Sequence, residues 1–447
     1  MVVFSIRLRC QGVFLLSLLT ILRMLGSPLP ATAETIDFVS VQRQALEHSF
    51  ALKVAGSDLA LKKIEQQEAG SLYFPTLSLR YDTGYAWALN ADGEAVTIGD
   101  SIGATDLSTW RNAFSLSGSL LLYDAGVREA GVEKARHGVR AAEQARQKQQ
   151  LALRLQVLES YLQGVRSQTD LSIRKQILAA RKQLYRALDR LRQAGTIDEA
   201  RVREAALALA EEVTRMDDLE LQFHAALESL TMLTGRTYDW RDTLLAPLPN
   251  PETGIENPVD VSRLPEIREL DEELAQLRAQ REAAGRSMFP TVGLYGNYRW
   301  YGADADSGWQ ALNDLSGRDA TLAVAVQWEF FSGFRDRLQV AKLDEQIRRL
   351  RWQRRQRIAE LQREVATLQH LARQMPTRIT HQQQRSKGAE GVDDAITRLG
   401  SRKLLDTPSI LAKRIERLGS DREESLKRTR QQGDLLRLAI LRQEAGS

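Results

Sequence analysis

An internal repeat constrains the fold of this chain more than any other feature. The segment Phe-Pro-Thr-Leu at 74–77 recurs as Phe-Pro-Thr-Val at 289–292, each time after a helical pattern and at the start of an alternating run. Further segments of the two halves match in the same order, and the number of residues between matching positions decreases along the chain. The chain is therefore predicted to be a tandem duplication, with repeats over residues 34–235 and 262–447.

Two segments lie outside the repeats. Residues 1–33 place arginines before an apolar run that leads to Ala-Thr-Ala, which is typical of a cleaved export signal. A membrane anchor is the alternative, but the run is interrupted by Arg23 and is shorter than the ~20 apolar residues that a bilayer needs. Residues 236–261 contain four prolines, so we predict an inter-repeat linker without a regular element.

Four runs alternate apolar and polar side chains with period two, which predicts strands with one apolar face. They cover residues 74–87 and 112–123 in the first repeat, and 289–301 and 320–331 in the second. Each run has about ten alternating residues, the length that a tilted strand needs to cross a bilayer. The connections within the two pairs are rich in Gly, Asp, Ser and Asn and are predicted to be exposed loops.

A half-buried sheet in a soluble domain shows the same alternation. Two features favour membrane strands instead. Charged residues lie at mid-strand on the polar faces, and aromatic residues gather near the run ends, as they do at membrane interfaces. The predicted interface residues are Trp87, Trp110 and Trp300 at one end, and Phe74, Phe289 and Phe331 at the other.

The rest of the chain has helical periodicity. Apolar residues from Leu151 to Val165 recur at alternating spacings of four and three, which predicts a coiled-coil seam in a helix over 127–193. At ~1.5 Å per residue this helix would be about 100 Å long. In the second repeat, Pro376 and two glycines predict a helix that kinks or frays before a turn at Gly400.

Four strands cannot close a barrel alone, because open edges in lipid leave backbone groups without hydrogen bonds. If the strands cross a membrane, the chain must therefore oligomerise. Three copies with four strands each make twelve strands, the smallest assembly expected to leave a passage, since side chains fill a barrel of about eight strands.

Chemical motifs are missing from the sequence. It has no zinc-protease, nucleophile-elbow or phosphate-loop motif, and its five histidines have no ligand-like spacing. The single cysteine, Cys10, precedes the apolar run of the export signal. We predict no catalytic site, no metal and no cofactor. A basic cluster near Arg351 has acidic neighbours and is interpreted as a solvated helix face, so no nucleic-acid partner is expected.

Taken together, these features resemble the TolC-like outer-membrane efflux proteins. The resemblance covers nearly the whole chain after residue 33, through a duplicated order of helix, strand, loop, strand, long helix, tip and helix. It is carried by strand starts, strand exits and hairpin tips at 74–75, 289–290, 123–126, 331–333, 192–195 and 398–400.

The resemblance implies a mainly helical fold with membrane β-strands. Four transmembrane strands per chain complete a twelve-stranded barrel in a homotrimer, and long helices continue it as a coiled-coil helical barrel. The implied location is the outer membrane, in contact with its lipid, with an extension into the periplasm. The implied function is a passive exit duct of a tripartite efflux or type I secretion system, which docks onto a periplasmic adaptor protein and an inner-membrane pump or ABC transporter.

The same resemblance implies two groups of site residues. An iris-like periplasmic gate would involve Arg402, Asp406, Asp198 and Arg201. Adaptor contact would fall on the hairpin tips Ala194, Gly195, Thr196, Leu399, Gly400 and Ser401. The chain departs from the family pattern at Thr397, Ser409 and Arg201, where an aromatic residue and two acids are common.

Some alternatives stay open at this point. Asp406 by itself is also typical of a helix start, and Asp198 either caps its helix or pairs with Arg201. A periplasmic coiled-coil scaffold or adaptor protein without a membrane barrel is the alternative for the whole chain. The cargo is not indicated by any part of the sequence.

Overall fold

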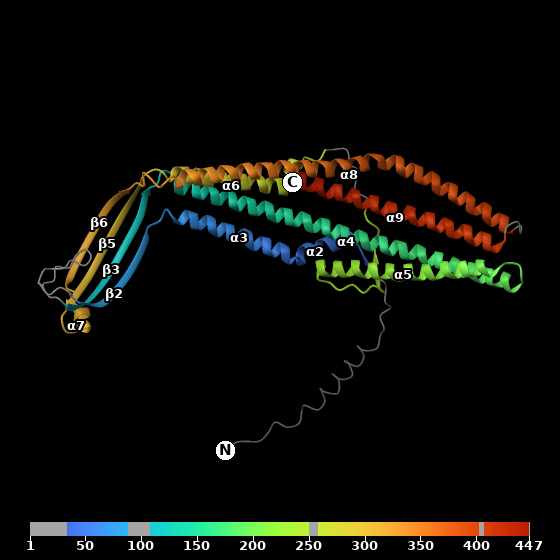
Figure 1. Ribbon diagram of the computed structural model, residues 1–447, viewed down its shortest axis with the longest axis horizontal. Helices are drawn as coiled ribbons and strands as arrows, with labels where there is room; N and C mark the ends of the chain where they lie inside the picture. The colour runs from blue at the N-terminus through green and yellow to red at the C-terminus, as the bar shows by residue number, and fades with distance from the viewer. Residues whose placement is uncertain (1–33, 88–107, 250–257, 402–405, 447) are drawn as a thin grey trace, which may run out of the picture. The chain divides into compact units, whose positions relative to one another are not determined.

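The computed structural model describes residues 34–87, 108–249, 258–401 and 406–446 (Figure 1). The predicted export signal, most of the first loop and Arg402 lie outside these residues. The first half contains β1 (Glu34–Ile36), α2 (Phe38–His48), α3 (Phe50–Ser71), β2 (Thr76–Trp87), β3 (Ser108–Tyr123), α4 (Val127–Gln193) and α5 (Glu199–Thr234). The second half contains β4 (Thr243–Leu245), a 3-10 turn (Val261–Arg263), α6 (Pro265–Arg286), β5 (Thr291–Asp304), α7 (Gly308–Asn313), β6 (Gly317–Gln327), α8 (Arg335–Ser401) and α9 (Thr407–Gly446).

The long helices agree with the periodicity of the sequence. Helix α4 begins and ends at the predicted residues and has 67 residues, and α8 has the same length. Residues of the predicted seam in α4, such as Leu158 and Val165, are buried at 4% and 6% exposure. The kink or fray expected before Gly400 does not end the second helix, because α8 stays helical through Pro376 to Ser401.

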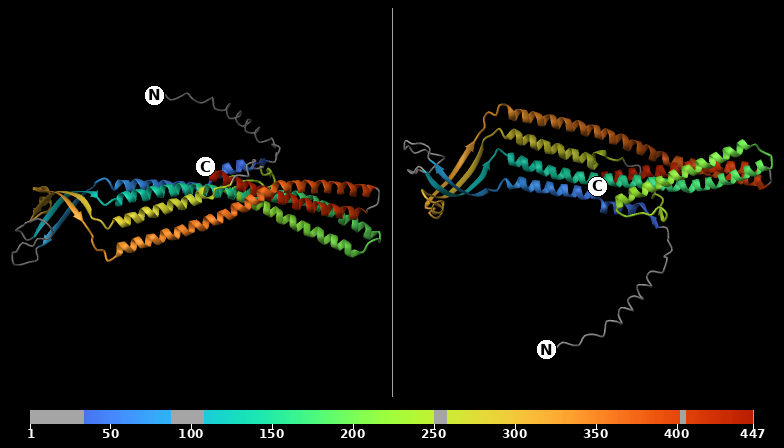
Figure 2. Two further views of the ribbon diagram at one scale, coloured as in Figure 1. Left: turned by 90° about the horizontal axis from the view of Figure 1, so that it is seen from above. Right: turned by 60° about the horizontal axis from the view of Figure 1, so that its bottom comes forward.

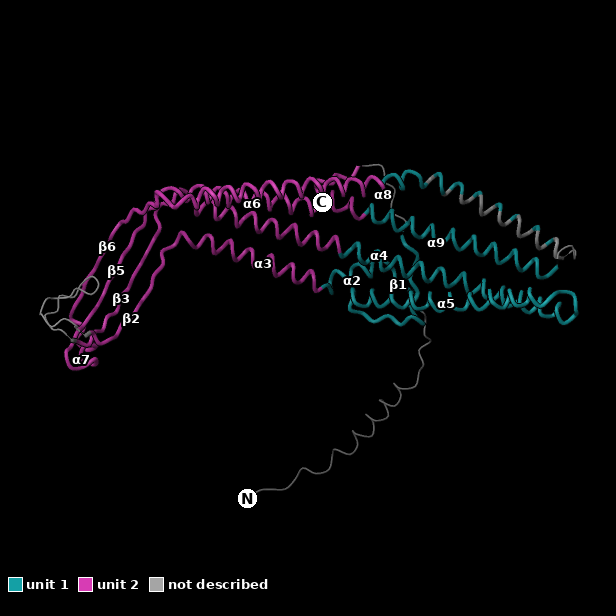
Figure 3. Tube along the Cα trace, in the orientation of Figure 1, with its two compact units in different colours: residues 1–49, 153–256, 368–439 teal, residues 50–152, 257–367, 440–447 magenta. Residues whose placement is uncertain are grey.

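The chain divides into two compact units (Figure 3). Unit 1 contains residues 1–49, 153–256 and 368–439, and unit 2 contains residues 50–152, 257–367 and 440–447. Both α4 and α8 contribute residues to each unit. The described helices contain no segment that is long and apolar enough to cross a membrane.

Unit 2 contains a four-stranded antiparallel sheet with the order β2-β3-β5-β6. The pairing of β3 with β5 joins the two repeats. The helices α3, α4, α6 and α8 lie side by side in the same order as the strands to which they connect (Figure 2). Ion pairs such as Lys148–Glu269 between α4 and α6 (2.8 Å) and Arg354–Asp271 between α8 and α6 (2.6 Å) join neighbouring helices. Helices α3 and α8 are therefore the edges of this layer.

Unit 1 contains a small parallel sheet in which β1 pairs with β4. The hydroxyl of the fully buried Tyr161 on α4 lies 2.8 Å from the carbonyl oxygens of both Ile36 and Ala246. The prediction that residues 236–261 contain no regular element is therefore wrong. Strand β4 has only three residues, too few to show a period, and its partner is more than 200 residues away in sequence.

The second loop also differs from the prediction, because it contains the short helix α7. Ser307 caps this helix, and Ala311 is fully buried against the backbone of Gly302, where a Cβ atom would lie 2.3 Å from the Ala311 carbonyl oxygen. The side chain of Asn112 accepts from Tyr81 Oη (2.7 Å) and donates to the carbonyl oxygen of Gly308 (2.8 Å). These contacts hold α7 against the sheet.

Candidate functional site

The sheet of unit 2 has one apolar face. Alternate residues come into register across the strands, as in Leu79↔Leu116↔Tyr298 and Leu120↔Leu294↔Val324. Many of these apolar side chains are exposed, with Leu77 at 73%, Leu79 at 69%, Leu322 at 77%, Val324 at 63% and Val326 at 69%. A broad apolar surface on a soluble chain is unusual, and it requires a partner or a lipid environment.

The opposite face of the sheet is polar. The row Arg80↔Ser115↔Arg299↔Asp319 runs across all four strands, and Arg299 Nη2 lies 2.8 Å from Asp319 Oδ2. Next to this row, on the same strands, lies a groove of about 350 Å³. It is lined mainly by hydroxyl and amide side chains: Thr76, Ser78, Ser117, Ser119, Asn297 and Thr321. An apolar and a polar face on the same strands are what a membrane barrel needs toward lipid and lumen.

Among the predicted interface aromatics, Trp87 and Trp110 lie at or near strand ends, whereas Trp300 lies four residues before the end of β5. Trp110 packs edge-on against Tyr85 at 5.3 Å between ring centroids, and Trp300 against Tyr298 at 4.4 Å. Trp87 is the last residue of β2, and its side chain lies outside the description. At the helix end of the sheet, Phe74, Phe289 and Phe331 are exposed at 72%, 58% and 65%. Their position at a lipid interface stays a prediction.

The first hairpin tip in unit 1 is an exposed turn between α4 and α5. Gly195 has φ 72°, which favours glycine. The backbone N–H groups of Gly195 and Thr196 donate to the carbonyl oxygens of Arg192 (2.9 Å) and Leu191 (3.0 Å), the two hydrogen bonds of a Schellman cap. The backbone of Ala194, Gly195 and Thr196 is thus held at an exposed position suitable for contact with a partner.

Asp198 caps α5. Its Oδ1 accepts from the backbone N–H of Arg201 at 3.1 Å, so the contact between these two residues uses the Arg201 backbone. Of the two alternatives for Asp198, the structure shows the helix cap.

Arg201 and Asp406 line one cavity of about 360 Å³ in unit 1. Leu184, Leu188 and Leu191 of α4 form its apolar wall, and the start of α9 contributes Pro408, Ser409 and Ala412. Asp406 directly precedes α9, and its carbonyl oxygen accepts from the N–H of Ile410 at 3.2 Å. The structure therefore places two predicted gate residues together, and Asp406 is at a helix start as well.

The second tip is described only in part. Leu399, Gly400 and Ser401 form the helical end of α8, so Gly400 is still part of the helix and the predicted turn at this residue is wrong. Arg402, the predicted basic gate residue, is outside the described residues. The gate and adaptor roles of these residues stay predictions.

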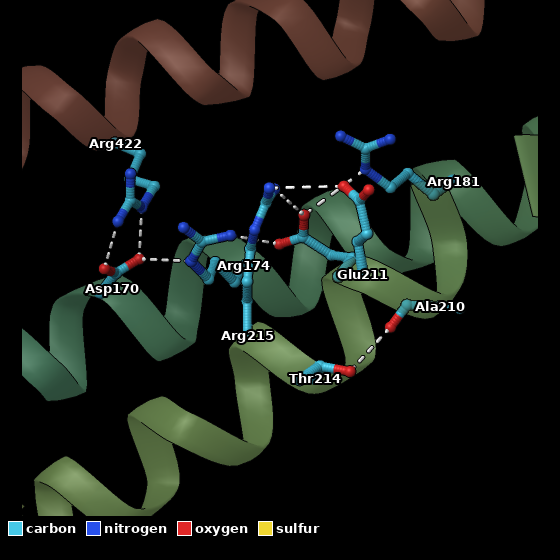
Figure 4. Close-up of polar contacts among 9 residues, drawn as sticks. Asp170, Arg174, Arg181, Ala210, Glu211, Thr214, Arg215 and Arg422 are labelled. Carbon is cyan, nitrogen blue, oxygen red and sulfur yellow. Dashed lines mark hydrogen bonds and ion pairs between the residues drawn. The ribbon is translucent and has the colours of Figure 1, made fainter. Parts of the chain in front are cut away.

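A network of buried charges in unit 1 was not predicted from the sequence (Figure 4). Arg422 of α9 donates through Nη2 to Asp170 Oδ2 of α4 at 2.6 Å. Arg174 joins Asp170 (3.1 Å) to Glu212 of α5 (2.7 Å), and Arg181 and Arg215 also lie near Glu212, at 3.5 and 3.9 Å. The side chains of Asp170 and Glu212 are only 7% and 2% exposed.

The sequence does contain a signal for part of this network. Glu212 stands four residues before Met216, in phase with the apolar seam of α5, where a charged side chain must find partners inside the helix bundle. The hydrogen bond from Arg422 to Asp170 raises the pKa of the Arg422 guanidinium above its ordinary value. Asp170 and Glu212 thus each have arginine partners from more than one position of the helices.

No group of His, Cys, Asp and Glu suitable for a metal ion occurs among the residues that the structure describes. His137 lies 2.7 Å from Glu272, without further ligand-type side chains.

Comparison with known proteins gives one family match. Residues 41–236 match the family model described as "Outer membrane efflux protein". The predicted resemblance to this family is confirmed. No curated protein matches the chain.

Solved structures of efflux-protein type share the fold over nearly the whole chain. The Campylobacter jejuni CmeC outer membrane channel has a TM-score of 0.75 at 14% identity, over 91% of this chain and 85% of that one. The outer membrane protein VceC of Vibrio cholerae has a TM-score of 0.70 at 15% identity, over 92% and 93%. The open state of the Neisseria gonorrhoeae MtrE outer membrane channel has a TM-score of 0.69 at 16% identity, over 92% and 89%.

These findings confirm the predicted fold class, and the likeness extends into the second repeat, which the family model does not cover. Together, the family match over residues 41–236 and the shared fold support a likeness to outer-membrane efflux proteins.

Proposed function

We propose that three copies of this efflux protein form a passive duct through the outer membrane. The observation that carries the proposal is the open sheet of four strands, apolar and exposed on one face and polar on the other. Strands β2 and β6 each have one neighbour in the sheet, so each leaves an edge unpaired. Pairing β6 of one copy with β2 of the next closes twelve strands and satisfies every edge.

The exposed surfaces of the helices in unit 2 also favour a ring of three copies. An exposed apolar stripe runs along α3, and its spacings of four, seven and three residues are those of a coiled-coil seam. Its members are Phe50, Val54, Leu61 and Ile64, exposed at 68%, 59%, 56% and 59%. On α8, at the other edge of the layer, Leu338 and Trp352 are exposed at 68% and 64%. A head-to-tail ring would bring these two edges together.

The periplasmic roles belong to the same proposal. Three copies of Asp406 around the axis would form an electronegative ring in the gate, with Arg201, Asp198 and Arg402 around it. The tips at 194–196 and 399–401 would bind the periplasmic adaptor, and an inner-membrane pump or ABC transporter would supply the energy. The rigid exposed cap at Gly195 and the cavity shared by Arg201 and Asp406 support this arrangement.

Recording from the purified protein in planar bilayers tests the proposed function. A trimeric duct is expected to give discrete conductance steps, whereas a periplasmic scaffold gives none. A protein that inserts into the bilayer without conductance would contradict the duct.

The orientation of the sheet makes a sharper prediction. Arginine in place of Val324, on the apolar face, is expected to cost about 2–4 kcal/mol of barrel stability, because the charge would face lipid. Arginine in place of the adjacent Ala323, on the polar face, is the matched control and is expected to be tolerated. Heat stability of the detergent-extracted protein measures both. Equal losses for Val324→Arg and Ala323→Arg would contradict a lumen on the polar face.

A further inference from the structure

One member of the charge network, Arg422, lies on α9, the helix that begins directly after the predicted gate residue Asp406. Asp406 directly precedes α9, and Arg422 lies about 24 Å along that helix, at ~1.5 Å per residue. Between the start of α9 and the first hairpin lies the cavity of about 360 Å³, with Asp406 in its lining and Leu411 buried near the start of the helix. Because Asp406 directly precedes a continuous helix, its position depends also on where α9 is held further along.

Among the contacts between α9 and α4, two lie beyond this cavity and are specific in geometry. At Gly433 the helices approach closely, since a Cβ atom there would lie 2.6 Å from Leu162 Cδ2. Nearer to the gate, Arg422 binds Asp170 through two nitrogen atoms, and its side chain is 25% exposed. Paired nitrogens on a carboxylate fix direction as well as distance.

The contact between Arg422 and Asp170 depends on few acidic groups, because arginines outnumber carboxylates in the network. Asp170 pairs with Arg422 and Arg174, and Glu212 pairs with Arg174, Arg181 and Arg215. Two buried carboxylates thus hold four arginines. Loss of the charge of Asp170 would leave Arg422 facing Arg174 with no carboxylate between them, so that α9 would be repelled from α4.

We propose that the Asp170–Arg422 ion pair is a positioning contact that holds α9 against the first hairpin and keeps the channel entrance narrow. This inference rests on the proposed function. The two residues act through the placement of α9 and do not touch the transported cargo.

Single-channel recording of four full-length variants tests the positioning role of the Asp170–Arg422 ion pair. Only trimeric protein is used. Arg422→Ala is expected to increase the occupancy of the open state, on the order of tenfold. Asp170→Asn is expected to have a larger effect, because it adds repulsion. The double variant should return to the level of Arg422→Ala, since the repelled arginine is then absent. Arg136→Ala, which removes an exposed ion pair with Glu133, is the control and should open like the wild type.

The outcomes separate the possibilities. Open-state occupancies of Asp170→Asn and Arg422→Ala equal to that of the control would overturn the proposal, even with lower melting temperatures, because the network would then only stabilise the fold. If these variants do not assemble, Arg422→Lys is used instead, because it keeps the charge but loses the paired nitrogens. An open-state occupancy above that of the wild type then supports the proposal. An occupancy equal to that of the wild type overturns it. A wild-type protein without conductance would refute the proposed duct instead.

Discussion

The double substitution Leu61→Lys/Ile64→Lys is expected to convert the trimer into monomers. Both side chains belong to the exposed stripe of α3, and in the proposed ring they are buried against the next copy. Burial of each contributes about 2 kcal/mol, and three interfaces form at once. Helix α8 carries Lys342 and Arg349 on its exposed surface, so introduced lysines also meet like charges.

The mass of the detergent-extracted protein measures this result. The matched control is Ala60→Lys/Gln67→Lys, which adds the same two charges at exposed positions of α3 off the stripe. The control is expected to remain trimeric. A trimer in the Leu61/Ile64 variant would show that the α3 stripe does not form the interface between copies.

The second large effect is expected at Asp406. In the trimer three carboxylates would lie close to one axis, where they attract cations and repel anions. Asp406→Asn should lower the preference for cations on the order of tenfold, and Asp406→Arg should reverse it, because the ring changes sign. Arg201 lines the same cavity and partly offsets the carboxylate, so Arg201→Ala should strengthen the cation preference.

Reversal potentials across a salt gradient give the permeability ratios. Glu416→Gln removes an exposed acid from α9 outside the cavity and serves as the control. It should leave the ratio unchanged. If Asp406→Arg leaves it unchanged as well, Asp406 is a helix-start residue without a part in the gate.

Much of the secondary structure follows from local periodicity. Helix α4 has the predicted bounds because its seam residues repeat at four and three over many turns. The strands were found because their alternation is long, although β3 and β5 extend beyond the predicted ends by several residues. Helix α7 was missed because a six-residue helix depends on its packing against Gly302 and Trp110.

The candidate site was predictable to a different degree in each part. Gly195 stands out because a tight turn after a long helix favours glycine, and its positive φ agrees. Asp198 had two possible roles, and only the position of the Arg201 backbone N–H distinguishes the cap. Arg201 and Asp406 are about 200 residues apart in sequence, and their shared cavity requires the packing of α9 on the first hairpin.

By itself, the sequence determined the duplicated order of elements, the two faces of the strands and the apolar seams of the helices, since these depend on which side chains recur at a period of two or of 3.6 residues. Only the tertiary structure decided the pairing of β1 with β4, the shared cavity and the network that joins Asp170, Glu212 and Arg422. A charged residue on a helix has the same local signature whether it is solvated or buried, because the partners that allow its burial come from other helices.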